Sequence, residues 1–259
     1  ITFTAPAFFP PRRMSSSLPL KPLLALLTCA LATLVSPKAQ AAELRVSDGT
    51  VIVEDGVAFI EVDVSWRLSW RNDTNWDAAW IFAKLPADGG GYQHISLVPE
   101  GHRLVRNERP AAPDPAFTTS PDSLGVFVYR DTETNERGSN RWRLHLQWAH
   151  DANDMPLDAL PETVKVYGVE MVYVPEGPFF VGDPANETGA FHEVAEDSTA
   201  RAPYRISSDD AIPVCSGPGS LCYPDSENAY LAQRYGDRTG PIPTDYPTGY
   251  GDYYLMKYE

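Results

Sequence analysis

A strict alternation of apolar and polar residues between Ile60 and Trp70 constrains the fold of this chain more than any other feature. The apolar positions are Ile60, Val62, Val64, Trp66, Leu68 and Trp70, and the positions between them are Glu61, Asp63, Ser65, Arg67 and Ser69. Successive side chains of a β-strand point to opposite faces, whereas a helix would mix the two sets. The segment is therefore predicted to be a strand with one buried and one hydrated face.

Further apolar runs predict more strands of the same kind. They cover residues 76–85, 92–98, 126–129 and 142–148, with a short strand near Leu104 in the proline-bearing loop 99–122. Gly, Asp and Asn turns separate them without a convincing amphipathic helix, which is typical of an antiparallel sandwich. We therefore expect a mainly β chain that begins with an antiparallel β-sandwich over residues 42–150. The tryptophans on its inner faces are interpreted as core residues, and stacking on sugar rings is the alternative.

The first 41 residues have the anatomy of an export signal. After Met14, the expected natural start, come a lysine, an apolar run over residues 22–35 and Ala39-Gln40-Ala41. A basic flank, a short apolar core and small residues before the cleavage point are typical of a secretory signal peptide, and the run is too short for a membrane span of roughly 20 residues. We expect cleavage after Ala41 and a secreted or periplasmic protein with no membrane span. Lipid attachment at Cys29 is the alternative.

Charge and cysteine content narrow the classes of partner. Residues 1–41 carry four cations and no acid, so their removal lowers the formal net charge from −14 to −18. Such an acidic chain excludes nucleic acid as an expected partner, because phosphate binding needs clustered Lys and Arg. In an exported chain, Cys215 and Cys222 on either side of a Gly/Pro loop predict a disulfide, and metal binding by the two thiolates is the alternative.

The second half of the chain has a different composition. Residues 151–163 are polar and proline-bearing, which predicts a linker, and alternation resumes after residue 164. The stretch 184–247 is rich in Gly, Pro, Ser, Asp and Tyr, with one short helix expected over residues 225–235. A final strand is expected from residue 253.

Two segments of this second half resemble the sulfatase-modifying-factor family, which includes the formylglycine-generating enzyme. The first segment, Met-Val-Tyr-Val-Pro-Glu-Gly-Pro-Phe-Phe-Val-Gly, fills the fixed positions of the family's opening motif, and the second ends in Lys-Tyr-Glu. The matching residues are Met171, Pro175, Gly177, Phe179, Gly182, Lys257, Tyr258 and Glu259. The first domain also resembles the accessory region of some exported bacterial members, through elements such as Asn75–Trp80 and Gly125–Arg130.

The resemblance implies a fold and a chemistry. Residues 164–259 would be the incomplete start of an irregular α+β domain related to C-type lectins, opened by a hairpin that turns at Pro175 and Gly177 and returns through Phe179–Val181. In the family, copper or iron ligands follow the Lys-Tyr-Glu strand. We therefore assign no catalytic, cofactor-binding or metal-binding residue to this chain, and copper or iron is implied only for a full-length protein.

Other groups with chemical potential have weaker patterns. The acidic stretches at residues 131–136 and 151–158 lack the spacing of the common calcium loop and are interpreted as polar loops. The histidines show no ligand spacing; they are His94, His102, His145, His150 and His192.

The functional expectation is the N-terminal part of an exported formylglycine-generating-enzyme-like protein. Its full-length form would be a metal-dependent oxidase acting on a protein or small molecule, and this fragment would lack the catalytic region. The alternative is a non-catalytic cell-envelope protein on a C-type-lectin-like fold that binds an unidentified protein or glycan.

Overall fold

The computed structural model describes residues 43–87, 89–183, 191–196, 201–222 and 240–258. The expected signal peptide and the helix expected over residues 225–235 lie outside these ranges. Within them the chain is mainly β, and the helical structure consists of two short 3-10 turns, His150–Asn153 and Leu157–Ala159. The mainly β class expected from the alternating runs is confirmed.

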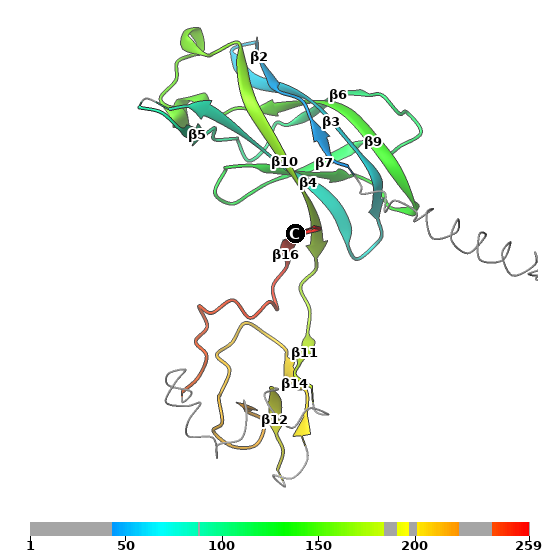
Figure 1. Ribbon diagram of the computed structural model, residues 1–259, viewed down its shortest axis with the longest axis vertical. Helices are drawn as coiled ribbons and strands as arrows, with labels where there is room; N and C mark the ends of the chain where they lie inside the picture. The colour runs from blue at the N-terminus through cyan, green and yellow to red at the C-terminus, as the bar shows by residue number, and fades with distance from the viewer. Residues whose placement is uncertain (1–42, 88, 184–190, 197–200, 223–239, 259) are drawn as a thin grey trace, which may run out of the picture. The chain divides into compact units, whose positions relative to one another are not determined.

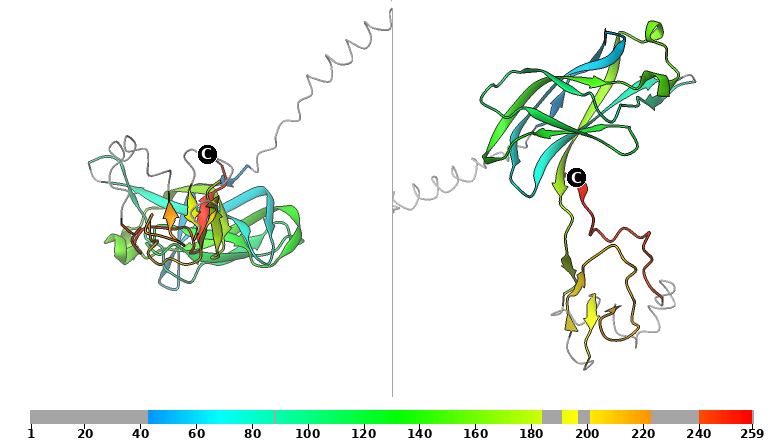
Figure 2. Two further views of the ribbon diagram at one scale, coloured as in Figure 1. Left: turned by 90° about the horizontal axis from the view of Figure 1, so that it is seen from below. Right: turned by 180° about the vertical axis from the view of Figure 1, so that it is seen from behind.

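One large antiparallel sheet contains most of the strands. They are β1 (Arg45–Val46), β2 (Gly49–Glu54), β3 (Val57–Arg71), β4 (Trp76–Pro86), β5 (Tyr92–His94), β6 (Arg103–Asn107), β7 (Pro115–Thr119), β8 (Val126–Arg130), β9 (Thr134–Gln147), β10 (Thr163–Val174) and β16 (Tyr253–Met256). Their order is β6-β9-β3-β2-β10-β4-β8-β7, with β1 beside β3, β5 beside β4 and β16 beside β10. Because β3 also pairs with β4 at Arg71 and Trp76, the sheet folds back on itself (Figures 1 and 2).

The inner faces of these strands share one hydrophobic core. Residues from β3, β9, β4, β8 and β10 alternate into it, as the period of two predicts. Its largest fully buried side chains are Trp66, Trp142, Trp148, Ile60, Ile81, Ile95, Leu97, Leu144 and Leu146. The rings of Trp66 and Trp142 meet edge to face, 5.1 Å apart. The core interpretation of these tryptophans, rather than a sugar platform, is confirmed for the three that are fully buried.

The alternation in β3 breaks near its end. Leu68 has φ +59° and the register with β9 shifts between Trp66 and Ser69, which is a β-bulge. The extra residue reverses the faces, so Ser69 is buried, Leu68 is exposed and Trp70 is only partly buried. The inward placement expected for Leu68 and Trp70 is therefore wrong, because the alternation cannot reveal a bulge within itself.

Several segments expected to be loops belong to the sheet. The strand near Leu104 is confirmed as β6, but β7 lies in the same proline-bearing stretch, and β9 begins inside the polar stretch before Trp142. Strand β10 pairs with β2 through Thr163 and Val164 and with β4 from Lys165 onward. The boundary expected at residue 164 therefore runs through one continuous sheet.

The remaining strands are short. They are β11 (Phe179–Val181), β12 (His192–Val194), β13 (Arg201–Ala202), β14 (Tyr204–Ile206) and β15 (Leu221–Cys222). Strand β11 pairs with β14 and not with β10, so the hairpin expected around Pro175 is wrong. A small core of Ile206, Ile212 and Leu221 lies among these strands.

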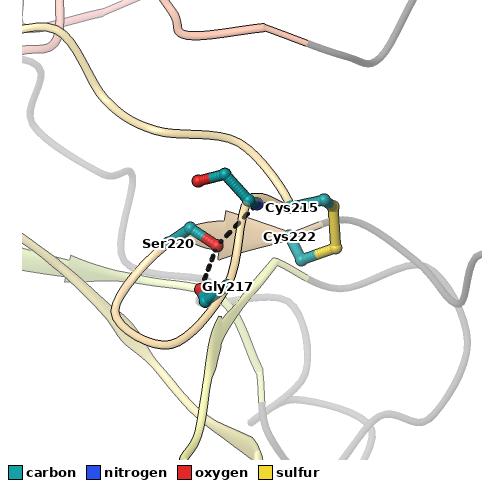
Figure 3. Close-up of a disulfide and its surroundings, with 5 residues drawn as sticks. Cys215, Gly217, Ser220 and Cys222 are labelled. Atoms are coloured by element: carbon teal, nitrogen blue, oxygen red, sulfur yellow. Dashed lines mark hydrogen bonds between the residues drawn. A yellow bond between two sulfur atoms is a disulfide. The ribbon is translucent and has the colours of Figure 1, made fainter.

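The predicted disulfide joins Cys215 and Cys222, whose Cα atoms are 4.8 Å apart (Figure 3). The loop between them is closed by Ser220, whose hydroxyl donates to the Gly217 carbonyl oxygen and accepts from the Ser216 amide. Since β15 also pairs with β12, the disulfide fixes this loop beside the small core. The disulfide is therefore placed to stabilise this part of the fold.

Candidate functional site

A buried group of charges connects β4, β10 and the end of the chain. The ammonium of Lys257 lies 3.2 Å from an Asp77 carboxylate oxygen and 3.3 Å from a Glu170 carboxylate oxygen. The side chains of Asp77, Glu170 and Lys257 are 1%, 8% and 17% exposed. We call these three residues the buried charge cluster. Its two carboxylates share one lysine, so removing that lysine would leave both without the cation that contacts them directly.

Asp77 is the centre of the cluster. One of its carboxylate oxygens accepts hydrogen bonds from the Ser69 hydroxyl at 2.9 Å and from the Trp70 amide at 3.0 Å, and the other accepts from the Trp66 indole at 3.3 Å. The bulge in β3 brings Ser69 inward and so supplies one of these donors. A buried carboxylate with this many donors is well solvated by protein groups. The arrangement ties the bulge, β4 and Lys257 together.

Glu170 connects the same lysine to the first residues described. One oxygen of its carboxylate accepts from the Leu44 amide at 3.0 Å. The other oxygen lies near Lys257 without hydrogen-bond geometry, so that contact is ionic only. The Lys257 amide also donates to the Glu170 carbonyl oxygen at 2.9 Å. Backbone and side chain together fix Lys257 against β10.

The cluster brings together the sequence elements that carry the resemblance. Asp77 belongs to the Asn75–Trp80 element, Glu170 precedes the opening motif, and Lys257 is the basic residue of the second motif. The two motifs are neighbours, because β16 pairs with β10 from Met171 opposite Met256 to Val174 opposite Tyr253 (Figure 1). Sequence reasoning singled out Lys257 but missed Asp77 and Glu170. A single acid in a strand that is apolar apart from Lys84, as Asp77 is, was the available signal.

The outer face of β8, β4, β10 and β16 carries a continuous row of aromatic rings, which we call the aromatic ladder. Its members are Tyr129, Trp76, Tyr173, Tyr254, Phe127, Trp80, Phe82 and Tyr167. The closest pairs are parallel: Trp76 on Tyr173 at 4.0 Å and Phe127 on Tyr254 at 3.8 Å between ring centroids. The ladder spans four strands and includes Tyr254, so it helps to hold β16 in place.

The ladder is organised for packing. The Trp76 ring stacks on Tyr129 and Tyr173, and the Arg71 guanidinium lies 4.7 Å from its centroid, whereas Tyr167 at the end of the ladder is 41% exposed. The Trp76 indole donates to the Tyr254 hydroxyl at 3.4 Å, and burial raises the pKa of Tyr254 well above its ordinary value. Burial, with the charge of Asp252, also raises the pKa of Tyr173. Both phenols are therefore neutral across the physiological range.

The other residues of the two family-like motifs shape the backbone or lie on the surface. Gly182 has φ +107°, and a Cβ there would collide with the Phe191 carbonyl oxygen. Gly177 has open space where its Cβ would be, and its amide donates to the Tyr250 carbonyl oxygen. Phe179 is exposed on β11, Pro175 lies just past β10, and Tyr258 is 52% exposed. Glu259 lies outside the described residues.

The comparison with protein-family models finds no match, and comparisons with curated proteins and with solved structures find no significant one.

The described part of the chain contains no group of side chains arranged as a metal site. No group of three or more His, Cys, Asp or Glu side chains converges there as a metal site would require. Cys215 and Cys222 are bonded to each other, so the alternative of two metal-binding thiolates is not realised. In the same ranges, no helix is long and apolar enough to cross a membrane.

In the alternating strand predicted over residues 142–148, His145 stands between the apolar positions, on the face expected to be hydrated, and it is buried on the outer face of β9. It lies between Glu61 and Arg103, with its Nε2 3.1 Å from a Glu61 oxygen and its Nδ1 3.0 Å from the Arg103 guanidinium. Because the arginine can only donate, Nδ1 of His145 accepts its hydrogen bond. Nε2 therefore carries the hydrogen and donates a hydrogen bond to Glu61. The ring of Phe59, 5.4 Å away, helps to cover it. These residues form a polar network on the outer face of the sheet. The period of the sequence predicts the correct face for His145 but does not predict that the side chain is buried.

His102 supplies a pH-dependent prediction. Its Nδ1 accepts from the Gln147 amide, its Nε2 lies 3.0 Å from the Thr119 hydroxyl, and burial lowers its pKa from 6.5 to about 4. The fold therefore favours the neutral ring, and this contribution is complete above pH 6.5 and lost as the pH falls towards 4. In the variant His102→Gln, the free energy of unfolding should depend less steeply on pH between 6.5 and 4. Denaturant titrations at a series of pH values measure this, and equal slopes for both proteins would contradict it.

Proposed function

We propose that this chain is the N-terminal part of an exported protein of the formylglycine-generating-enzyme type, and that its β domain holds the opening strands of the second domain. The observation that carries the proposal is the register of β10 with β16, which sets the two family-like motifs side by side. Neighbouring strands are what two motifs from the start of one domain require. The buried charge cluster strengthens the proposal, because Lys257 is a motif residue with a defined partner set.

In this proposal the described residues support catalysis without performing it. The aromatic ladder and the buried charge cluster position β16, and the ligands for copper or iron come from sequence beyond the Lys-Tyr-Glu motif. The disulfide agrees with an exported protein, because such bonds persist in oxidising compartments. The full-length form would oxidise a protein or a small molecule.

The experiment compares this chain with the product of its reading frame extended past Glu259. Both proteins are incubated with a cysteine-containing peptide, oxygen and either copper or iron, and aldehyde formation is followed by mass spectrometry. We expect aldehyde or another oxidised product only from the extended protein. Oxidation of the substrate by this chain alone, or a reading frame that ends at Glu259, would overturn the proposal.

The glycan-binding alternative finds less support in the aromatic surface. Sugar recognition needs an uncovered ring face, and the rings of Trp76 and Phe127 are stacked on Tyr173 and Tyr254. Specific binding of a neutral glycan to residues 42–259, lost on substitution of Trp76 or Trp80, would favour the alternative instead.

A further inference from the structure

A hollow of about 620 Å³ opens between residues 109–113 and the first residues of β9. Its volume is within the range of sites that bind small organic molecules. One side is formed by small and cyclic apolar residues, Pro110, Ala111, Ala112 and Pro113. Arginines from three different segments also line it: Arg109, Arg130 and Arg137. The hollow therefore combines an apolar wall with a concentration of positive charge.

Arg130 is the fixed cation of this group. It is only 2% exposed, and its guanidinium donates to the Asn140 side-chain oxygen at 3.0 Å and to the Thr134 hydroxyl at 2.8 Å. A longer contact of 3.4 Å reaches the Glu136 carbonyl oxygen. Its hydrogen-bond acceptors among the described residues are all neutral. Burial lowers the pKa of Arg130, and the negative charge of Asp77 opposes that effect.

The apolar wall is held in place before any ligand arrives. The Trp142 indole donates to the Pro113 carbonyl oxygen at 3.2 Å, and the Asn107 amide group donates to the Ala112 carbonyl oxygen at 3.0 Å. The Arg109 amide in turn donates to the Asn107 side-chain oxygen at 2.9 Å. Since Trp142 belongs to the main core, this wall is fixed to the most rigid part of the fold. A preformed wall lowers the entropy cost of binding.

The two other arginines supply charge that no described acid neutralises. Arg109 and Arg137 are exposed, and neither forms an ion pair within the described ranges. Arg109 also lines a second hollow of about 380 Å³ together with Arg45 and Arg141, which form ion pairs with Glu43 and Glu108. The one acid on the wall of the larger hollow is Glu136. In a chain whose formal net charge is −14, such a local excess of arginine is a specific feature rather than an average one.

From this arrangement we infer that the larger hollow binds a small organic anion, a molecule with an apolar body and a carboxylate or sulfonate group. The apolar body packs on residues 110–113, and the anionic group lies among Arg109, Arg130 and Arg137. Guanidinium groups suit this role, because their planar donors match the oxygens of such groups. The inference is independent of the proposed function, since neither family-like motif contributes to the hollow.

Isothermal titration calorimetry on the chain from residue 42 onward tests this inference. The probes are benzoate and benzenesulfonate, which separate the two kinds of anionic group, and benzyl alcohol as a neutral molecule of similar size. At least one of the anions should bind with a one-to-one stoichiometry, and benzyl alcohol should not. Raising the salt concentration should weaken the binding, because exposed charges contribute to it.

Matched variants locate the site. Arg109→Gln and Arg137→Gln should each weaken binding of that anion about tenfold, the usual effect of losing one charge-assisted hydrogen bond. Arg205→Gln removes an exposed arginine on β14 and should change nothing, whereas Glu136→Gln should strengthen binding because it removes the acid on the wall. No binding of either anion, equal binding of benzyl alcohol, or an equal loss in Arg205→Gln would overturn the inference.

Discussion

The variant Lys257→Met is expected to unfold with a free energy about 3 kcal/mol lower than that of the natural chain at neutral pH. Methionine preserves most of the side-chain volume, so the effect isolates the charge. Without the ammonium group, Asp77 keeps its three other donors, but Glu170 and Asp77 become two buried carboxylates with no cation between them. Urea titration followed by tryptophan fluorescence measures the change, because Trp66 donates to Asp77.

Two comparisons test the physical reason for that loss. Lys165→Met removes an exposed lysine from β10, where the ion pair with Asp48 is hydrated, and should cost less than about 1 kcal/mol. Adding Glu170→Gln to Lys257→Met should recover part of the lost stability, because one of the uncompensated charges is gone. An equal cost for Lys257→Met and Lys165→Met would show that the cluster does not hold β16.

How far the sequence predicts this fold depends on what kind of information each strand carries. Strand β3 and the end of β9 can be predicted from the sequence, because a strand with one buried and one hydrated face has alternating apolar and polar residues. Strand β7 does not, since it is five residues long and begins at a proline, and prolines usually indicate a loop. The bulge at Leu68 cannot be predicted from the sequence for another reason. It exchanges the two faces of the strand without changing the composition of the strand.

The candidate site was predictable only in part. The motif residue Lys257 and the disulfide pair Cys215–Cys222 could be named from local sequence. Asp77 and Glu170 could not, because the three members of the buried charge cluster lie more than 80 residues apart along the chain, and only the pairing of β10 with β4 and β16 brings them together. Arg130 and Arg109 could not be grouped from the sequence either, because they line one hollow only after β8 and the loop before β7 have been placed.

The opening motif contains two glycines that the sequence pattern treats alike and the structure does not. Gly182→Ala should destabilise the segment containing β11 and β14 by about 3 kcal/mol. Alanine is strained at φ +107°, and its Cβ would overlap the Phe191 carbonyl oxygen, which is backbone and cannot rotate away. Hydrogen exchange of the β11 and β14 amides measures this local loss, while the amides of β3 and β9 should keep their protection.

Gly177→Ala is the matched control in the same motif. Its Cβ would meet nothing within 4 Å, its φ is not positive, and the hydrogen bond from its amide to the Tyr250 carbonyl oxygen is retained. The expected change is within about 0.5 kcal/mol. If the two variants lost protection equally, the fixed glycines would be serving a need other than backbone geometry. If only Gly182→Ala loses protection, position 182 must be glycine because its backbone has a positive φ and lies against the Phe191 carbonyl oxygen.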